Sequence, residues 1–200
     1  MKWAAAALAC ALLLAQVSSP FDEASRLYNE RRFREAAVVL ERTQPADRKA
    51  RLLLGLCWQQ AGELNKAESV LQETARLESD WPDARYALAR VQFMRGRFVE
   101  ALANARAARD LGEPAARVWH LIGRIEEERG RFNQALAAYR EAIHSDSMMA
   151  EARAGEGSVL FKLGQYAQAK TSAETALRLD PASDEARRIL EQVKRASGSA

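Results

Sequence analysis

Glycines spaced 34 residues apart are the feature of this sequence that most limits its fold. They are Gly62, Gly96, Gly130 and Gly164. Before and after each one, apolar residues recur at intervals of three to four, which is the spacing of one face of a helix. Glycine enters the left-handed backbone conformation at little cost and therefore often ends helices. The spacing predicts successive helical hairpins of equal length.

Small residues repeat in the same register. The first helix of each predicted hairpin carries a small residue at a fixed place, and the second carries an alanine five residues after the turn glycine. These positions are Gly55, Ala89, Gly123 and Gly157, and Ala67, Ala101, Ala135 and Ala169. Small side chains let paired helices come close. A single hairpin cannot bury its apolar face alone, so neighbouring hairpins must stack.

The most complete copy of the unit spans residues 116–149. It contains Trp119-x2-Ile122-Gly123 and Ala135-x3-Tyr139, and the last copy closes with Leu179-Asp180-Pro181. These motifs and their period resemble the tetratricopeptide repeat family. The resemblance covers about residues 48–181 as four repeats, with Arg51, Arg85 and Arg153 in place of the opening tryptophan. It implies an all-α fold, a right-handed α-solenoid of antiparallel helix hairpins.

Two further segments flank the four repeats. Residues 21–47 are expected to form a diverged amino-terminal repeat, in which Arg31 stands where later hairpins have the turn glycine. Residues 182–200 are expected to form a C-terminal capping helix that shields the last hairpin from water. Its Ile189, Leu190 and Val193 should face inward, and its outward residues should be Arg187, Arg188, Glu191 and Lys194.

The first twenty residues predict export. Lys2 precedes an apolar run that ends in small polar residues, which is the pattern of a secretory signal peptide. The run is shorter than the ~20 residues that a membrane-spanning helix needs. The cleavage position stays open. The expected location is periplasmic or secreted, with an uncleaved leader or a lipidated Cys10 and peripheral membrane association as alternatives.

Charge excludes some partners. The net charge is +3 at neutral pH, and it becomes +2 once Lys2 leaves with the leader. The charges are dispersed along the chain, so nucleic-acid binding is not expected. Arg31, Arg32 and Arg34 cluster locally around Phe33, and we interpret this cluster as a solvated turn.

The sequence contains few residues of the types that catalyse reactions or bind metals. Cys57 lies among apolar residues and is expected to be a buried structural thiol. His120 and His144 have no further ligands at metal-binding spacing. The run 126–128 is glutamate throughout and is interpreted as a solvated helix face. No nucleotide-binding, nucleophile or metalloprotease motif occurs. The sequence therefore predicts no enzyme, no cofactor and no small-molecule substrate.

The resemblance implies instead a groove lined by the first helices of the repeats. By that analogy the peptide-binding residues are Leu56, Tyr86, Arg90, Phe93, Arg117, His120, Arg124, Ser158 and Phe161, and Met94, Leu121, Glu127, Glu151 and Lys162 lie beside them. Arg90 and Arg124 are in register and should project into one groove. The paired donors of each guanidinium suit a carboxylate of the ligand.

These observations predict a non-enzymatic scaffold that binds a peptide or helix of a partner protein. By resemblance, one setting is the assembly of complexes in the bacterial envelope. The alternative is a structural subunit that self-associates through Ile189, Leu190 and Val193.

Overall fold

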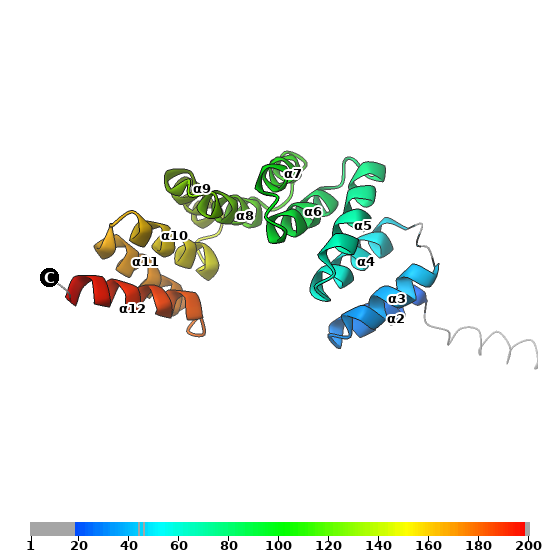
Figure 1. Ribbon diagram of the computed structural model, residues 1–200, viewed down its shortest axis with the longest axis horizontal. Coiled ribbons are helices and arrows are strands. Elements are labelled where there is room, and N and C mark those ends of the chain that lie inside the picture. The colour runs from blue at the N-terminus through cyan, green and yellow to red at the C-terminus, as the bar shows by residue number, and fades with distance from the viewer. Residues whose placement is uncertain (1–18, 44, 46, 199–200) are drawn as a thin grey trace, which may run out of the picture. The chain divides into compact units, whose positions relative to one another are not determined.

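The structure is a computed structural model that describes residues 19–43, 45 and 47–198. The described residues form helices and no strands (Figure 1). They divide into two compact units at Ser79–Asp80. The leader prediction for residues 1–18 lies outside the described residues. No helix among the residues described has the length and apolar character to cross a membrane.

The first unit contains two hairpins. Helices α2 (Pro20–Asn29) and α3 (Phe33–Thr43) form the first, and α4 (Arg48–Gln60) and α5 (Leu64–Leu77) form the second. Helices α2 and α3 lie where the diverged amino-terminal repeat is predicted. Arg31 has φ +61°, so it occupies the left-handed conformation that the turn glycines adopt in later hairpins. The alanine of each second helix, Ala36 and Ala67, is fully buried.

The second unit contains three hairpins and a final helix. The hairpins are α6 (Pro82–Met94) with α7 (Phe98–Asp110), α8 (Ala115–Glu128) with α9 (Phe132–Ser145), and α10 (Ala150–Lys162) with α11 (Tyr166–Leu179). Helix α12 (Asp184–Gly198) packs on α11 and α10 (Figure 1). The predicted all-α fold of stacked hairpins is confirmed.

The turns and close contacts follow the predicted register. Gly62, Gly96, Gly130 and Gly164 all have φ between +71° and +80°. Ala101, Ala135 and Ala169 are fully buried. At the last hairpin two backbones meet, since a Cβ on Gly157 would lie 3.2 Å from the carbonyl oxygen of Ala169. Small residues at these places therefore set the distance between paired helices.

Helix α12 caps the second unit. The hydroxyl of Ser183 accepts a hydrogen bond from the backbone N–H of Ala186 at 3.3 Å, which supports the start of the helix. Ile189 and Val193 are buried in the core of the last two hairpins, and Leu190 packs against it. This apolar face is covered within the chain, so it does not offer the self-association surface of the alternative prediction.

Cys57 is fully buried in the first unit, as predicted. Burial raises the pKa of its thiol to about 12. The thiolate, which is the nucleophilic form, is therefore strongly disfavoured near neutral pH.

Candidate functional site

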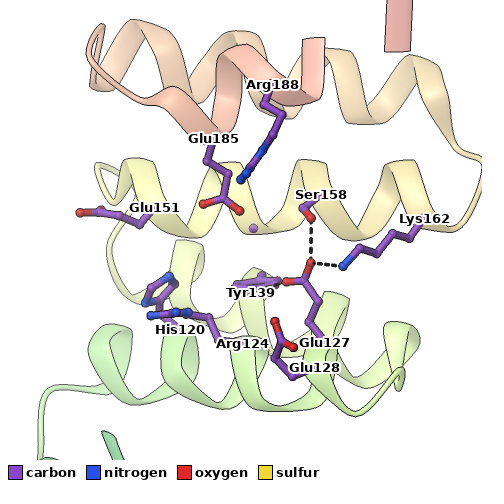
Figure 2. A pocket seen from close by; sticks show the side chains of 11 residues that line it. His120, Arg124, Glu127, Glu128, Tyr139, Glu151, Ser158, Lys162, Glu185 and Arg188 are labelled. Atoms are coloured by element: carbon purple, nitrogen blue, oxygen red, sulfur yellow. Dashed lines mark hydrogen bonds and ion pairs between the residues drawn. The ribbon is translucent and has the colours of Figure 1, made fainter. Parts of the chain in front are cut away.

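The second unit contains a hollow of about 480 Å³. Side chains from α8, α9, α10 and α12 line it (Figure 2). Its lining residues are His120, Arg124, Glu127, Glu128, Tyr139, Glu151, Gly155, Ser158, Lys162, Glu185 and Arg188. Most of them are charged or polar, so the cavity suits a polar ligand better than an apolar one.

Glu127 on α8 holds one wall together. Its Oε1 accepts the hydroxyl of Ser158 at 2.7 Å and the ammonium of Lys162 at 2.9 Å (Figure 2). Its Oε2 accepts the hydroxyl of Tyr139 at 2.7 Å. These donors come from α9 and α10, so one carboxylate ties three helices together. Charge-assisted hydrogen bonds are the stronger kind, which makes this wall rigid.

Two glycines create the space that Tyr139 occupies. A Cβ on Gly123 would lie 2.7 Å from the ring of Tyr139, and one on Gly155 would collide with the same ring. The ring therefore lies against the backbones of α8 and α10, and Tyr139 is only 1% exposed. Burial, together with the charge of Glu127, raises the pKa of the Tyr139 hydroxyl. The hydroxyl stays protonated and donates to Glu127.

His120 and Arg124 lie one turn apart on α8. Burial lowers the pKa of His120 to about 4, helped by the positive charge of Arg124, so the imidazole is neutral near pH 7. The guanidinium carbon of Arg124 lies 4.7 Å from the centre of the Phe93 ring. This cation–π contact orients Arg124. Within the described part of the chain, no carboxylate forms an ion pair with Arg124.

A second, smaller hollow of about 80 Å³ adjoins the first. It is lined by Tyr86, Arg90, Phe93, Met94, His120, Leu121 and Arg124. His120 and Arg124 line both hollows, and the two neighbouring hollows together are here called the trough. The trough extends from α6 across α8 to α12. As predicted, Arg90 and Arg124 share it.

Arg117 is engaged with its own neighbours. Its guanidinium pairs with Glu113 at 3.0 Å and lies 4.6 Å from the centre of the Tyr86 ring. Glu113 is almost fully buried, and burial raises its pKa although Arg117 partly opposes the shift. Arg117 therefore supports the α7–α8 loop and is less available to a ligand than Arg90 or Arg124.

Helix α12 supplies the far wall through Glu185 and Arg188. Arg188 is exposed, in keeping with its predicted outward position, and its side chain also lines the cavity (Figure 2). Burial and the charge of Glu127 raise the pKa of Glu185, against the pull of Arg188, Arg124 and Lys162. Glu185 thus faces charged groups of both signs across the cavity.

Comparison with known proteins identifies the fold's family. The sequence profile described as Tetratricopeptide repeat matches residues 21–79, 59–116 and 120–184. The chain belongs to the tetratricopeptide repeat family. No curated protein matches its sequence. The tetratricopeptide repeat fold implies protein or peptide partners.

Solved structures share this tetratricopeptide repeat fold at low identity. One chain of the APC/C hetero-tetramer Cut9-Hcn1 has a TM-score of 0.76 and 18% identity. The match covers 87% of the present chain but only 35% of the Cut9-Hcn1 chain. A thermophilic tetratricopeptide repeat protein of Thermus thermophilus has a TM-score of 0.70 and 18% identity, over 87% of this chain and 97% of its own. YrrB, described as having an unusual peptide-binding site, has a TM-score of 0.60 and 18% identity, over 76% and 78%.

Most predicted groove residues of this tetratricopeptide repeat protein are accounted for in the second unit. Tyr86, Arg90, Phe93, His120, Arg124 and Ser158 line the trough. Phe161 does not, because its ring packs 5.4 Å from that of Tyr166 and against the core of the last hairpins. Leu56 is half-buried in the first unit.

The solvated-face interpretation of residues 126–128 is wrong for its first two members. Glu126 is 4% exposed and pairs with Arg129 at 3.3 Å. The side chain of Glu127 is 11% exposed and fully engaged. Only Glu128 is exposed. Consecutive helical residues point in different directions, so Glu126 serves the hairpin turn, Glu127 is bonded inside the trough, and Glu128 lines the trough while remaining exposed.

The sequence analysis did not assign Glu185 and Arg188 to the groove, although the 34-residue register could have predicted them. Glu185 lies 34 residues after Glu151, and Arg188 lies 68 after His120. Extending the groove positions into α12 would have found both. In the described residues, no group of His, Cys, Asp and Glu is arranged to hold a metal ion.

Proposed function

We propose that the trough binds an extended or helical segment of a partner protein that carries an acidic residue or a free C-terminus. The observation that carries the proposal is the pair Arg90 and Arg124, which are in register on α6 and α8 and share one hollow. Neither forms an ion pair among the described residues. Two unpaired guanidinium groups beside aromatic rings suit a carboxylate with apolar neighbours.

The phenyl ring of Phe93 leaves the N–H groups of Arg124 available. A cation–π contact uses no N–H donor in a hydrogen bond, so the donors of Arg124 can still bind a carboxylate. Tyr86 and Leu121 provide apolar surface in the same hollow. The site is therefore preorganised for a charged group with an apolar flank, which reduces the cost of ordering side chains on binding.

In this proposal the protein is a non-enzymatic scaffold. It works outside the cytoplasm, because residues 1–20 have the charge, length and ending of an export signal, and one setting is assembly of bacterial envelope complexes. Intact-mass determination on the protein from its native cell tests the location. A shortened chain outside the cytoplasm supports it, a diacylglycerol adduct on Cys10 selects the lipoprotein alternative, and a cytosolic chain that begins at Met1 contradicts it.

Selection from a displayed library of random peptides with free C-termini tests the binding. We expect peptides rich in carboxylates or carrying apolar residues next to the C-terminal carboxylate. Arg90→Ala and Arg124→Ala should each weaken the selected peptides about ten- to a hundred-fold, the equivalent of one charge-assisted hydrogen bond.

Arg106→Ala is the matched control, because Arg106 is an exposed arginine on α7 that does not line the trough. It should leave affinity unchanged. All three variants should change the free energy of unfolding by no more than about 0.5 kcal/mol. Unchanged affinity in both trough variants would place the binding site elsewhere. A large loss of stability would mean that the arginines are structural.

A further inference from the structure

The charges of the trough are unevenly distributed along its length. The α6–α8 end carries Arg90 and Arg124 and no carboxylate. The opposite end carries Glu128, Glu151 and Glu185 from α8, α10 and α12. In the part of the chain that the structure describes, none of these three carboxylates forms an ion pair. The same hollow also holds Lys162, which pairs with Glu127, and Arg188, so its carboxylates outnumber its cations but do not stand alone. A segment lying along the trough therefore meets only positive charge in the smaller hollow and a net negative charge in the larger one.

Glu185 is the best placed of the three carboxylates to contact a ligand. Its neighbour Ala186 is fully buried and Ile189 is 2% exposed, so this part of α12 is fixed against the last hairpins. Its carboxylate points into the cavity (Figure 2). Glu151, by contrast, points away from the centre of the same view.

Glu185 faces charged groups of both signs, but none of them forms an ion pair with it among the described residues. Glu127 faces it from α8 but is already bonded to Tyr139, Ser158 and Lys162. The repulsion between Glu185 and Glu127 is strong enough to add to the effect of burial on the Glu185 pKa. Arg188, Arg124 and Lys162 oppose this effect without forming an ion pair with Glu185. A cation brought by a ligand would relieve the repulsion and gain a partner in a partly desolvated site.

Resting on the proposed function, we infer that the trough recognises a dipolar partner segment, with a carboxylate at Arg90 and Arg124 and a lysine or arginine side chain at Glu185. Charges of opposite sign in the two hollows of the trough would fix the direction of the bound segment. The reversed segment would place like charges together at both ends, which disfavours it. The glutamates of the α12 end likewise repel polyanions, so the occupant is a protein segment.

Peptide selection on paired variants tests this inference. The displayed library is selected on the wild-type protein, on Glu185→Gln and on Arg124→Gln. Wild-type selection should enrich peptides that carry an acidic and a basic residue at a constant separation and order. Selection on Glu185→Gln should lose the basic residue and keep the acidic one, and selection on Arg124→Gln should do the reverse. Glu191→Gln is the matched control, since Glu191 is an exposed glutamate of α12 outside the trough.

Affinity and pH give a second readout. A selected dipolar peptide should bind Glu185→Gln about ten-fold more weakly than wild type. Its affinity for the wild type should fall as acid protonates Glu185, and this fall should be smaller for Glu185→Gln. Glu185→Lys should go further and select peptides with an acidic residue in place of the basic one. Circular dichroism melts of each variant establish that the fold is retained.

The outcomes separate the inference from the function on which it rests. Failure to enrich any peptide whose binding is weakened by Arg90→Ala or Arg124→Ala would contradict the proposed function itself. Enrichment of acidic peptides with no basic residue would leave that function standing and overturn the dipolar recognition. A basic preference that survives in both Glu185→Gln and Glu185→Lys would also overturn it.

Discussion

Glu127 offers a sharp test of how the trough is held together. Replacing it with alanine removes the acceptor of three donors, and the cost differs among them. The hydroxyl of Tyr139 is buried and would lose its acceptor, which costs about 1–3 kcal/mol. The bond from Ser158 contributes about 0.5–1.5 kcal/mol. The side chain of Lys162 is 42% exposed and can be solvated, so its loss adds little.

The expected effect of Glu127→Ala is therefore a loss of about 2–4 kcal/mol in the free energy of unfolding. Denaturant unfolding followed by circular dichroism measures it. Glu128→Ala is the matched control, because Glu128 is the adjacent, exposed glutamate of the same helix. It should change stability by less than about 0.5 kcal/mol.

A second substitution separates the loss of the Tyr139–Glu127 hydrogen bond from the cost of leaving the Tyr139 hydroxyl without an acceptor. Adding Tyr139→Phe to Glu127→Ala removes the hydroxyl that has no acceptor, so the double variant should be about 1 kcal/mol more stable than Glu127→Ala alone. Two results would refute the reasoning. Glu127→Ala could match Glu128→Ala, or Tyr139→Phe could destabilise the Glu127→Ala background as much as it does the wild type.

Other predictions concern packing, charge and backbone conformation. Ala135→Leu should overpack the fully buried contact of α9 and lower the free energy of unfolding by about 1–3 kcal/mol. Ala137→Leu, on the exposed face of the same helix, should change it little. Equal effects of the two variants in denaturant unfolding would contradict this. The pKa of His120 is lowered on folding to about 4, so its contribution to stability is complete above its ordinary pKa of 6.5 and is lost as the pH falls toward 4. Between pH 7 and pH 5, the free energy of unfolding should therefore fall by about 1–2 kcal/mol less in His120→Gln than in the wild type. Arg31→Gly should raise the free energy of unfolding by about 0.5–1 kcal/mol, because the φ of Arg31 is +61° and glycine adopts this conformation more easily. Arg34→Gly, within α3, should lower it. Thermal melts of both variants check the sign.

The sequence predicted the hairpins because their register depends on few, strongly constrained positions. A positive φ favours glycine at each turn, and a fully buried alanine such as Ala101 or Ala169 leaves no volume for a larger side chain. Such positions tolerate few residue types and therefore recur visibly. The division at Ser79–Asp80 was not predictable, since the 34-residue register runs across it without a change.

The trough was predicted in part. Arg90 and Arg124 follow from register alone. The bond from Tyr139 to Glu127 does not, because it depends on a small residue in another repeat. Gly155 stands where earlier repeats have Leu53, Ala87 and Leu121, and its missing side chain admits the Tyr139 ring. A site that depends on such a long-range fit becomes visible only once the helices are placed.

Departures from the family pattern are compensated within their own hairpins. Arg51 pairs with Glu78 at 2.8 Å, and Arg85 bonds Asn104 at 3.3 Å, where the repeat would have an aromatic residue to pack. Each arginine contributes its apolar stem to the packing and finds a polar partner for its head group. The loss of the tryptophan signature therefore does not disturb the register, which the small residues maintain.

In the fourth repeat, a charged residue also replaces an apolar one at a core position. Glu156 stands where earlier repeats have Leu54, Leu88 and Ile122, and it is 8% exposed. Its carboxylate accepts the hydroxyl of Ser172 at 3.0 Å and a guanidinium N–H of Arg140 at 3.2 Å, and Arg153 lies 3.6 Å away. A buried carboxylate persists only where such partners satisfy it. Arginine in place of the tryptophan occurs with leucine at the later position in two repeats, Arg51 with Leu54 and Arg85 with Leu88, so the glutamate of the fourth repeat depends on Ser172 and Arg140 as well as on Arg153. The repeat pattern predicts where a side chain lies, whereas its chemical type depends on partners that the pattern does not contain.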